Sequence, residues 1–189
     1  MSPFDYLSVL ISIVLGLSIT QLLGGFAAMV RARDRISFYW PLPVQMTGLF
    51  LINVQVWWAL FGLREKQHWT FGAFFVILLQ PVTLYLMSAF ITLDPVADGA
   101  RFDQREFYFR EKNWFFAAAL ATLLASLTKD LFVTGGPIGL PDLTAHGVFV
   151  AMSLTGLLTK NDVVQKILAP VTLILYCTYI AALFMALPR

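Results

Sequence analysis

Long runs of residues without a single charged side chain constrain this chain more than any other feature. Four such runs cover residues 6–30, 36–63, 69–93 and 167–188. A helix of roughly 20 residues crosses the hydrocarbon core of a bilayer, so each run is long enough to span a membrane. Only 13% of the residues are charged, whereas a soluble domain has about 25%. We therefore expect an integral membrane protein whose main partner is the lipid bilayer.

Two further segments complete a predicted bundle of six transmembrane helices. Residues 113–134 carry Lys129 and Asp130 near their end, and residues 143–159 contain His146. Backbone groups in lipid must be hydrogen-bonded within the chain, and the runs lack the alternating pattern of barrel strands. The connections between the runs are short. The sequence therefore predicts an all-α membrane protein, a single six-helix domain that comprises all 189 residues.

The short connections differ in their content of Lys and Arg. The first, third and fifth connections carry most of these residues, namely Arg31, Arg33, Arg35, Arg101, Arg105, Arg110, Lys112, Lys160 and Lys166. Such residues are enriched in the cytoplasmic loops of membrane proteins. We therefore expect both termini on the non-cytoplasmic side and a basic cytoplasmic loop over residues 95–112. This loop is either an ordinary charged connection or an amphipathic segment on the membrane surface.

The two halves of the sequence, residues 1–94 and 113–189, share short matches in the same order. The tetrapeptide Pro-Val-Thr-Leu occurs at 81–84 and again at 170–173, and weaker matches relate 47–51 to 146–150 and 18–20 to 126–128. Because three helices are an odd number, two such halves would have opposite topologies, as in the 3+3 inverted repeats of many transporters. The alternative is that apolar sequences built from few residue types match by chance.

Polar side chains inside the predicted helices are the candidates for a site, because each must face protein or water rather than lipid. The candidates for a pathway or a polar core are Ser12, Thr20, Gln21, Gln45, Asn53, Gln55, Gln80, Lys129, Asp130 and His146. One narrow stripe of small and partly polar side chains recurs at spacings of three or four residues, namely Asp5, Ser8, Ser12, Gly16, Thr20 and Gly24. Close helix packing is the favoured explanation of this stripe, and a pathway-lining face is the alternative.

Lys129, Asp130 and His146 are the charged or titratable members of this set. Adjacent residues on a helix point about 100° apart, so we expect Lys129 and Asp130 to pair with different partners. One interpretation is a site that responds to protons or ions, with His146 contributed by the next helix. The favoured alternative is an interfacial charge pair and a capping histidine near the helix ends.

The sequence offers no pattern for catalysis, cofactor binding or metal binding. Cys177 is the only cysteine, so a cysteine-based metal cluster has no ligands. His146 is the only histidine inside a predicted helix, which argues against a haem held by two histidines. A net charge of +2 with scattered basic clusters argues against nucleic-acid binding. We therefore expect no cofactor, and enzymatic activity has no positive support.

The first half of the chain resembles a known group of proteins. Residues 4–20, the tripeptide Phe38-Tyr39-Trp40 and residues 56–60 are similar to segments of small, uncharacterised bacterial membrane proteins of the multi-pass type. The resemblance fades after Leu93. It implies a location in a bacterial inner membrane, and it transfers no substrate, cofactor or site residue.

These patterns support two functional hypotheses, and a third, an intramembrane enzyme or cofactor carrier, would require His146 and the nearby charges to converge. The leading one is a small channel or transporter, assembled as a homo-oligomer, that conducts an ion or small solute along intramembrane amides and hydroxyls. Its support is the internal repeat and the number of polar residues inside the predicted helices. The rival is a membrane subunit or sensor that transports nothing and binds a membrane or cytoplasmic protein partner. A transporter requires polar side chains that meet at a water-accessible site, whereas a subunit requires a dry core.

Overall fold

The computed structural model describes residues 3–64, 68–92, 101–134 and 139–183. Its α-helices are α1 (Pro3–Arg31), α2 (Pro41–Ala59), α3 (Phe71–Ile91), α4 (Gln104–Lys129), α5 (Leu140–Leu158) and α6 (Asp162–Leu183). Short 3-10 helices, η1 (Arg33–Arg35) and η2 (Leu60–Leu63), follow α1 and α2, and a π-helical turn, η3 (Asp130–Thr134), follows α4. Strand β1 (Ile36–Ser37) pairs in parallel with β2 (Phe102–Asp103).

Five helices within these described ranges are long and apolar enough to cross a membrane: α1, α2 continued by η2, α3, α4 continued into η3, and α6. Large apolar side chains face outward on these helices, for example Leu17, Trp114 and Ile174, each more than half exposed. Such surfaces are unfavourable in water and favourable in lipid. The predicted class, a helical integral membrane protein, is therefore confirmed at this level.

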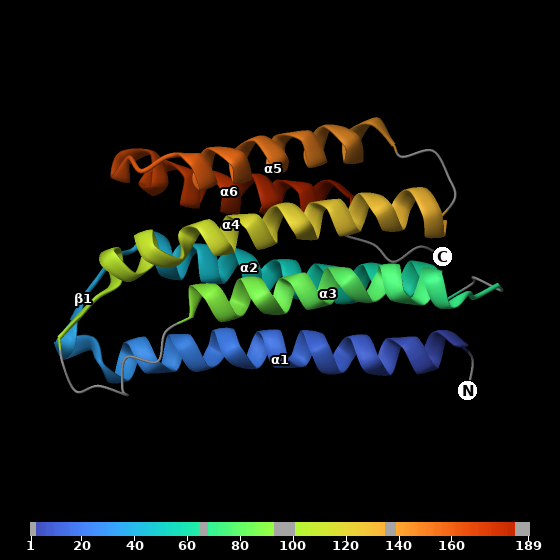
Figure 1. Cartoon of the computed structure of the whole chain (residues 1–189), viewed down its shortest axis with the longest axis horizontal. Coiled ribbons are helices and arrows are strands. Elements are labelled where there is room, and N and C mark those ends of the chain that lie inside the picture. The colour runs from blue at the N-terminus through green and yellow to red at the C-terminus, as the bar shows by residue number, and fades with distance from the viewer. Residues whose placement is uncertain (1–2, 65–67, 93–100, 135–138, 184–189) are drawn as a thin grey trace.

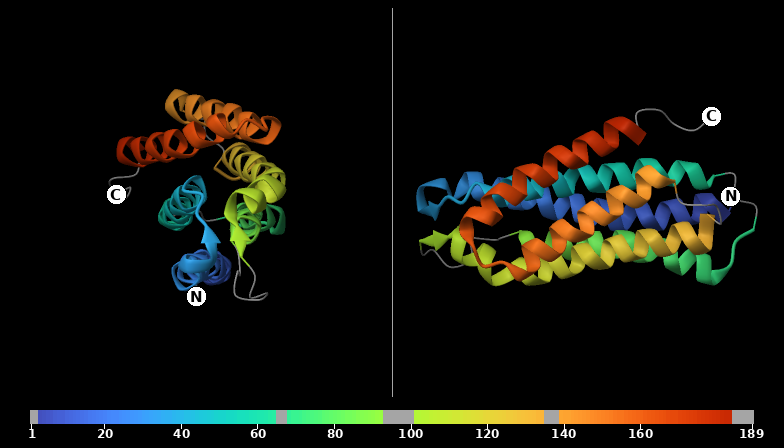
Figure 2. Two further views of the ribbon diagram at one scale, coloured as in Figure 1. Left: turned by 90° about the vertical axis from the view of Figure 1, so that its left-hand side faces the viewer. Right: turned by 90° about the horizontal axis from the view of Figure 1, so that it is seen from above.

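The helices form one elongated bundle in which successive helices run in opposite directions (Figure 1). Helix α1 packs against α2 and α3, α4 packs against α3 and α5, and α6 packs against α2 and α5. Helices α5 and α6 thus lie on one side of the bundle and α1 on the other (Figures 1 and 2). We call the end where α1 begins and α6 ends the terminal end, and the opposite end, which holds β1, the strand end.

Helix α4 begins earlier than the sequence analysis predicted. The Asp103 carboxylate accepts hydrogen bonds from the backbone N–H groups of Arg105, at 2.8 Å, and Glu106, at 3.1 Å, which caps the helix at Gln104. The predicted basic loop over residues 95–112 is therefore wrong from residue 104 onward, while residues 93–100 lie outside the described part of the chain.

Helices α5 and α6 also begin a few residues before their predicted segments, for a related reason. Each carries an aspartate in its first turn, Asp142 in α5 and Asp162 in α6. Negative charge is stabilising at a helix N-terminus because unpaired N–H groups point outward there. Charged residues that marked loop boundaries in the sequence therefore belong to the helices.

Candidate functional site

A cavity of about 450 Å³ lies inside the bundle, between α2, α3, α4, α5 and α6. Helix α1 contributes Ile11 to the lining among the described residues. Sites for small organic molecules usually have volumes of about 300–1,000 Å³ and mostly apolar walls with a few polar groups. This cavity has that size and that composition, so it is the candidate site.

The cavity reaches one end of the bundle and stops short of the other. Toward the strand end its lining begins at Val44 of α2, Met87 of α3 and Phe115 of α4. Toward the terminal end it continues to Leu63 at the end of η2 and to Gly139, the residue that precedes α5. Within the described residues, the cavity is therefore one-sided.

The charged part of the lining lies near the terminal end. Lys129 Nζ is 3.6 Å from Asp130 Oδ1, and both side chains are about one-quarter exposed, at 21% and 28%. On α5, Asp142 accepts a hydrogen bond of 3.0 Å from the Tyr179 hydroxyl of α6 through its Oδ1 atom. The backbone oxygen of Asp142 lies 2.8 Å from Nδ1 of the buried His146. Three helices thus bring titratable groups to this part of the cavity.

Amides and hydroxyls line the deeper part. The Tyr176 hydroxyl donates a 2.9 Å hydrogen bond to Gln55 Oε1, which joins α6 to α2 across the cavity wall. Gln80 lies on α3 next to Pro81, which has no N–H to donate to the carbonyl of Ile77, one turn earlier. Thr122 of α4 is also part of the lining. Polar groups therefore face the cavity from four helices.

A hydrogen-bond network closes the bundle between the cavity and the strand end. Gln45 Nε2 donates to the Tyr108 hydroxyl at 3.0 Å, and that hydroxyl donates to Gln165 Oε1 at 2.8 Å. Gln165 Nε2 in turn donates to the backbone oxygens of Gly156, at 2.8 Å, and Thr159, at 3.1 Å. We call the side chains of Gln45, Tyr108, Gln165 and Lys112 the closing network.

Lys112 is the charged member of the closing network and is only 3% exposed. Its ammonium group donates to the backbone oxygens of Gly156, at 3.0 Å, and Leu157, at 2.9 Å, in the last turn of α5. It also donates to Asn113 Oδ1 at 3.0 Å. A cation is favourable at this position because the carbonyl groups at a helix C-terminus carry partial negative charge.

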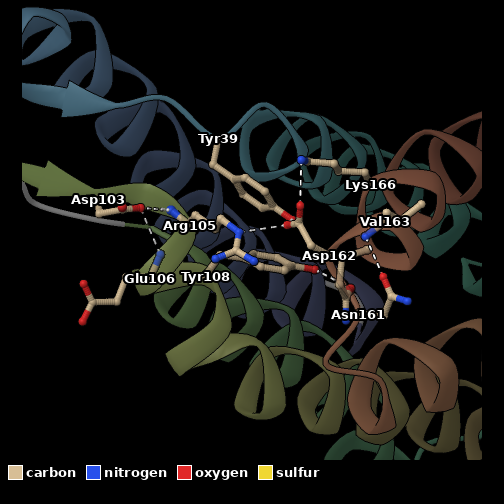
Figure 3. Close-up of polar contacts among 10 residues, drawn as sticks. Tyr39, Asp103, Arg105, Glu106, Tyr108, Asn161, Asp162, Val163 and Lys166 are labelled. Atoms are coloured by element: carbon tan, nitrogen blue, oxygen red, sulfur yellow. Dashed lines mark hydrogen bonds and ion pairs between the residues drawn. The ribbon is translucent and has the colours of Figure 1, made fainter.

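Beyond the closing network, a cluster of charged residues lies at the strand end (Figure 3). Asp162 accepts hydrogen bonds of 3.1 Å from both the Tyr39 hydroxyl and Arg105 Nε, and it pairs with Lys166 at 2.7 Å. Burial and the neighbouring Asp162 carboxylate raise the pKa of Tyr39 well above its usual value, so the phenol stays protonated and donates. The cluster ties α4 and α6 to the segment that precedes α2.

The structure divides the predicted candidates into two groups. Six line the cavity: Gln45, Gln55, Gln80, Lys129, Asp130 and His146. Lys129 and Asp130 pair with each other, so the expectation of separate partners is wrong. The flexible lysine side chain is long enough to curl around the helix toward its neighbour.

The other four candidates lie away from the cavity. Ser12 accepts a hydrogen bond from the indole of Trp57 on α2, and Gln21 donates to Thr92 at the end of α3. Asn53 is fully buried and donates to the backbone oxygen of Leu49 in its own helix, while Thr20 is exposed.

The stripe of small residues on α1 faces outward. Ser12, Gly16, Thr20 and Gly24 are all exposed. A Cβ atom added at Gly16 or Gly24 would have no neighbouring atom within 4 Å. The predicted close packing at these glycines is therefore not found within the chain, and the stripe does not line the cavity.

Sequence reasoning missed several polar residues around the cavity, namely Tyr108, Lys112, Asp142, Gln165, Tyr176 and Tyr179. Lys112 was assigned to a loop, and its partners are backbone oxygens 44 and 45 residues away. A sequence signal did exist for Tyr176 and Tyr179, since their spacing of three residues places them on one helix face.

Comparisons with known proteins reveal no relative: no family model, curated protein or solved structure matches the chain. The resemblance to small bacterial membrane proteins therefore stays a prediction. The functional assignment rests on the cavity and on the residues that close it.

Proposed function

We propose that this protein is a membrane carrier that moves a small solute by alternating access. The observation that carries the proposal is the one-sided cavity of about 450 Å³, which reaches the terminal end and is closed toward the strand end by side chains. A carrier exposes its site to one side of the membrane at a time. The arrangement has the form of one such state, open toward the terminal end.

The closing network suits a barrier that opens and closes. A hydrogen bond contributes a net of about 0.5–1.5 kcal/mol, so separating the Gln45–Tyr108–Gln165 chain costs a few kcal/mol if water replaces the partners. Conformational equilibria in proteins commonly involve free-energy differences of this size. A permanently open channel has no such barrier, so the closing network favours a carrier over an open channel.

The proposal includes six membrane crossings, with α5 as the sixth. Its 19 residues extend over roughly 29 Å, which matches the hydrocarbon core of a bilayer. Asp142, His146 and Ser153 lower the hydropathy of α5, but all three line the cavity rather than a lipid-facing surface. An even number of crossings puts both termini on one side, and the basic residues at the strand end support a cytoplasmic location for that end in this proposal.

The 3+3 inverted repeat is not needed for this mechanism. Pro81 and Pro170 lie inside α3 and α6, as the repeat requires. In such a repeat, helices α1, α2 and α3 correspond to α4, α5 and α6. The contact between α3 and α4 would then be matched by a contact between α6 and α1. Among the described residues, however, α6 packs mainly against α2 and α5. The repeat therefore stays a prediction, as does the location in a bacterial inner membrane.

Solute uptake into sealed liposomes that contain the purified protein tests the proposal. The panel would include protons, monovalent ions, amines, amino acids and carboxylates, each compared with empty liposomes. We expect uptake of at least one solute, with a large loss in Gln55→Ala and Asp130→Ala and little change in the control Gln21→Ala, which lies outside the cavity. Absence of uptake across the panel would contradict the proposal and favour the partner-binding subunit.

A further inference from the structure

Three aromatic rings form one wall of the cavity near the terminal end. Phe149 of α5 lies with its ring centroid 5.7 Å from that of Tyr176 and 6.2 Å from that of Tyr179, both on α6. The two tyrosine centroids are 6.0 Å apart, and all three residues line the cavity. The face of an aromatic ring carries partial negative charge, so a ring that turns its face toward a cavity attracts a cation.

A carboxylate lies directly beside this aromatic wall. Asp142 Oδ1 accepts the hydrogen bond from Tyr179, and among the described residues no Lys or Arg side chain forms an ion pair with Asp142. Asp142 occupies the first turn of α5, where the helix dipole stabilises a negative charge. The carboxylate is therefore held in place by Tyr179 and, among the described residues, has no basic side chain paired with it.

Among the described residues, the other titratable groups that line the cavity supply no positive charge paired with Asp142. The positive charge of Lys129 is matched by Asp130, which lies 3.6 Å away. Nδ1 of His146 is engaged with the backbone oxygen of Asp142, and the Tyr176 and Tyr179 hydroxyls donate their protons to oxygen acceptors. Among the described residues that line the cavity, the acidic and basic side chains are Lys129, Asp130 and Asp142, so two carboxyl groups face one ammonium group.

We propose that the solute is a small organic cation, an alkylammonium, bound between the Asp142 carboxylate and the wall of Phe149, Tyr176 and Tyr179; this inference rests on the proposed carrier function. Aromatic walls recognise ammonium groups whose hydrogens are replaced by methyl groups, because such cations are weakly hydrated. A cavity of about 450 Å³ holds a molecule of that class.

Two other classes of solute fit less well. A divalent metal ion requires several oxygen or nitrogen ligands, and the described residues contain no group of three His, Cys, Asp or Glu side chains placed to supply them. An anion would need an available cation, whereas Lys129 is already paired with Asp130. The charge and the aromatic wall together favour the organic cation.

Binding of choline, compared with its uncharged isostere 3,3-dimethylbutan-1-ol, tests the inference. The two molecules have nearly the same shape and differ in the positive charge. Isothermal titration of each into the full-length protein in detergent should give an affinity for choline at least tenfold higher. Equal affinities, or the absence of choline binding, would overturn the inference.

Two variants locate the site. Asp142→Asn keeps the acceptor for Tyr179 and removes the charge, so choline affinity should fall by tenfold or more. Phe149→Leu removes one ring and should weaken choline binding about 3- to 30-fold, since cation–π contacts contribute roughly 0.5–2 kcal/mol. The matched control is Asp34→Asn, an exposed carboxylate at the strand end, which should leave binding unchanged. Wild-type affinity in both Asp142→Asn and Phe149→Leu would overturn the inference, and the second variant preserves the test if the first does not fold.

Uptake of labelled choline by liposomes separates this inference from the proposed function. Binding that needs Asp142 and Phe149 but occurs without uptake would support the organic-cation site and contradict the carrier. Uptake of a neutral or anionic solute by a protein that does not bind choline would support the carrier and overturn the organic cation.

Discussion

The two ends of the bundle are built differently. At the strand end, side chains fill the space between the helices: Gly156 lies directly against the ring of Phe116, and Lys112 is buried against the end of α5. At the terminal end, the cavity lining extends to the helix ends, and Gly62, which belongs to that lining, has no atom within 4 Å of an added Cβ. The comparison shows that one bundle combines a closely packed closure with an accessible site.

The closure is polar rather than apolar. A tightly interlocked apolar core is costly to separate and difficult to form again in a second arrangement. Side-chain hydrogen bonds at the closing network can exchange for hydrogen bonds to water when the strand end opens. The closing network can therefore open without leaving its polar groups unpaired, and four pairs of variants test how much packing and polar contacts contribute at the two ends.

The largest effect on stability is expected at Lys112. Lys112→Met keeps the apolar part of the side chain and removes the donor to the buried Gly156 oxygen and the part-buried Leu157 oxygen, so the free energy of unfolding should fall by about 3 kcal/mol. Arg110→Met on the same helix is the control, because Arg110 is 65% exposed and such pairs contribute less than about 1 kcal/mol. Unfolding in mixed detergent micelles measures the stability of both variants. Equal losses of stability would contradict the stabilising role of the buried Lys112 at the strand end.

The next effect concerns two glycines of α5. A Cβ atom at Gly156 would overlap the Phe116 ring, so Gly156→Ala should destabilise the protein by about 2 kcal/mol. Gly147→Ala meets open space and should be neutral or stabilising by up to about 1 kcal/mol, because alanine favours the helix. The same unfolding measurement checks both variants. Similar changes in stability would contradict the difference in packing around Gly156 and Gly147.

A smaller effect is expected from a single hydroxyl. Tyr108→Phe removes the oxygen that joins Gln45 to Gln165 and should lower the free energy of unfolding by about 1–2 kcal/mol. Tyr85→Phe, at an exposed position of α3, should change it by less than about 0.5 kcal/mol. If the Tyr108 variant is as stable as the control variant, the closing network contributes nothing measurable to the closed state.

The smallest effect belongs to the charge pair at the terminal end. Asp130→Asn should cost about 0.5 kcal/mol, because its ion pair with Lys129 is partly exposed and 3.6 Å long. Asp162→Asn at the strand end should cost about 1 kcal/mol or more, because Asp162 has three partners at 2.7–3.1 Å. A larger loss for Asp130→Asn would show that the terminal end is the more rigid one.

The sequence predicted the membrane helices because their strongest signal, the absence of charge, depends on composition alone. It also predicted polar residues that line the cavity, such as Gln55, Lys129 and His146, because a polar group within a lipid-spanning helix must face protein or water. The same rule did not distinguish Gln55, which lines the cavity, from Gln21, because a polar side chain between two packed helices also faces protein.

The starts of the helices and the closing network were harder to predict. The charged residues of segment 95–112 predicted a loop. In the structure, however, α4 begins at Gln104 because Asp103 caps the helix there. The partners of Lys112 are backbone oxygens of α5, which are present in every sequence and carry no signal. Contacts of this kind depend on how α4 and α5 pack, and this packing cannot be predicted from a single sequence.

The most direct test of the one-sided cavity is the accessibility of single cysteines to a membrane-impermeant, charged thiol reagent. Cys177→Ser removes the only native cysteine, and Ser126→Cys then puts a thiol in the cavity lining, with Ala121→Cys on the exposed face of α4 as the control. In oriented proteoliposomes, we predict labelling of Ser126→Cys from the terminal side only and no labelling of Ala121→Cys. Labelling of Ser126→Cys from neither side, or equally from both sides, would contradict the one-sided cavity.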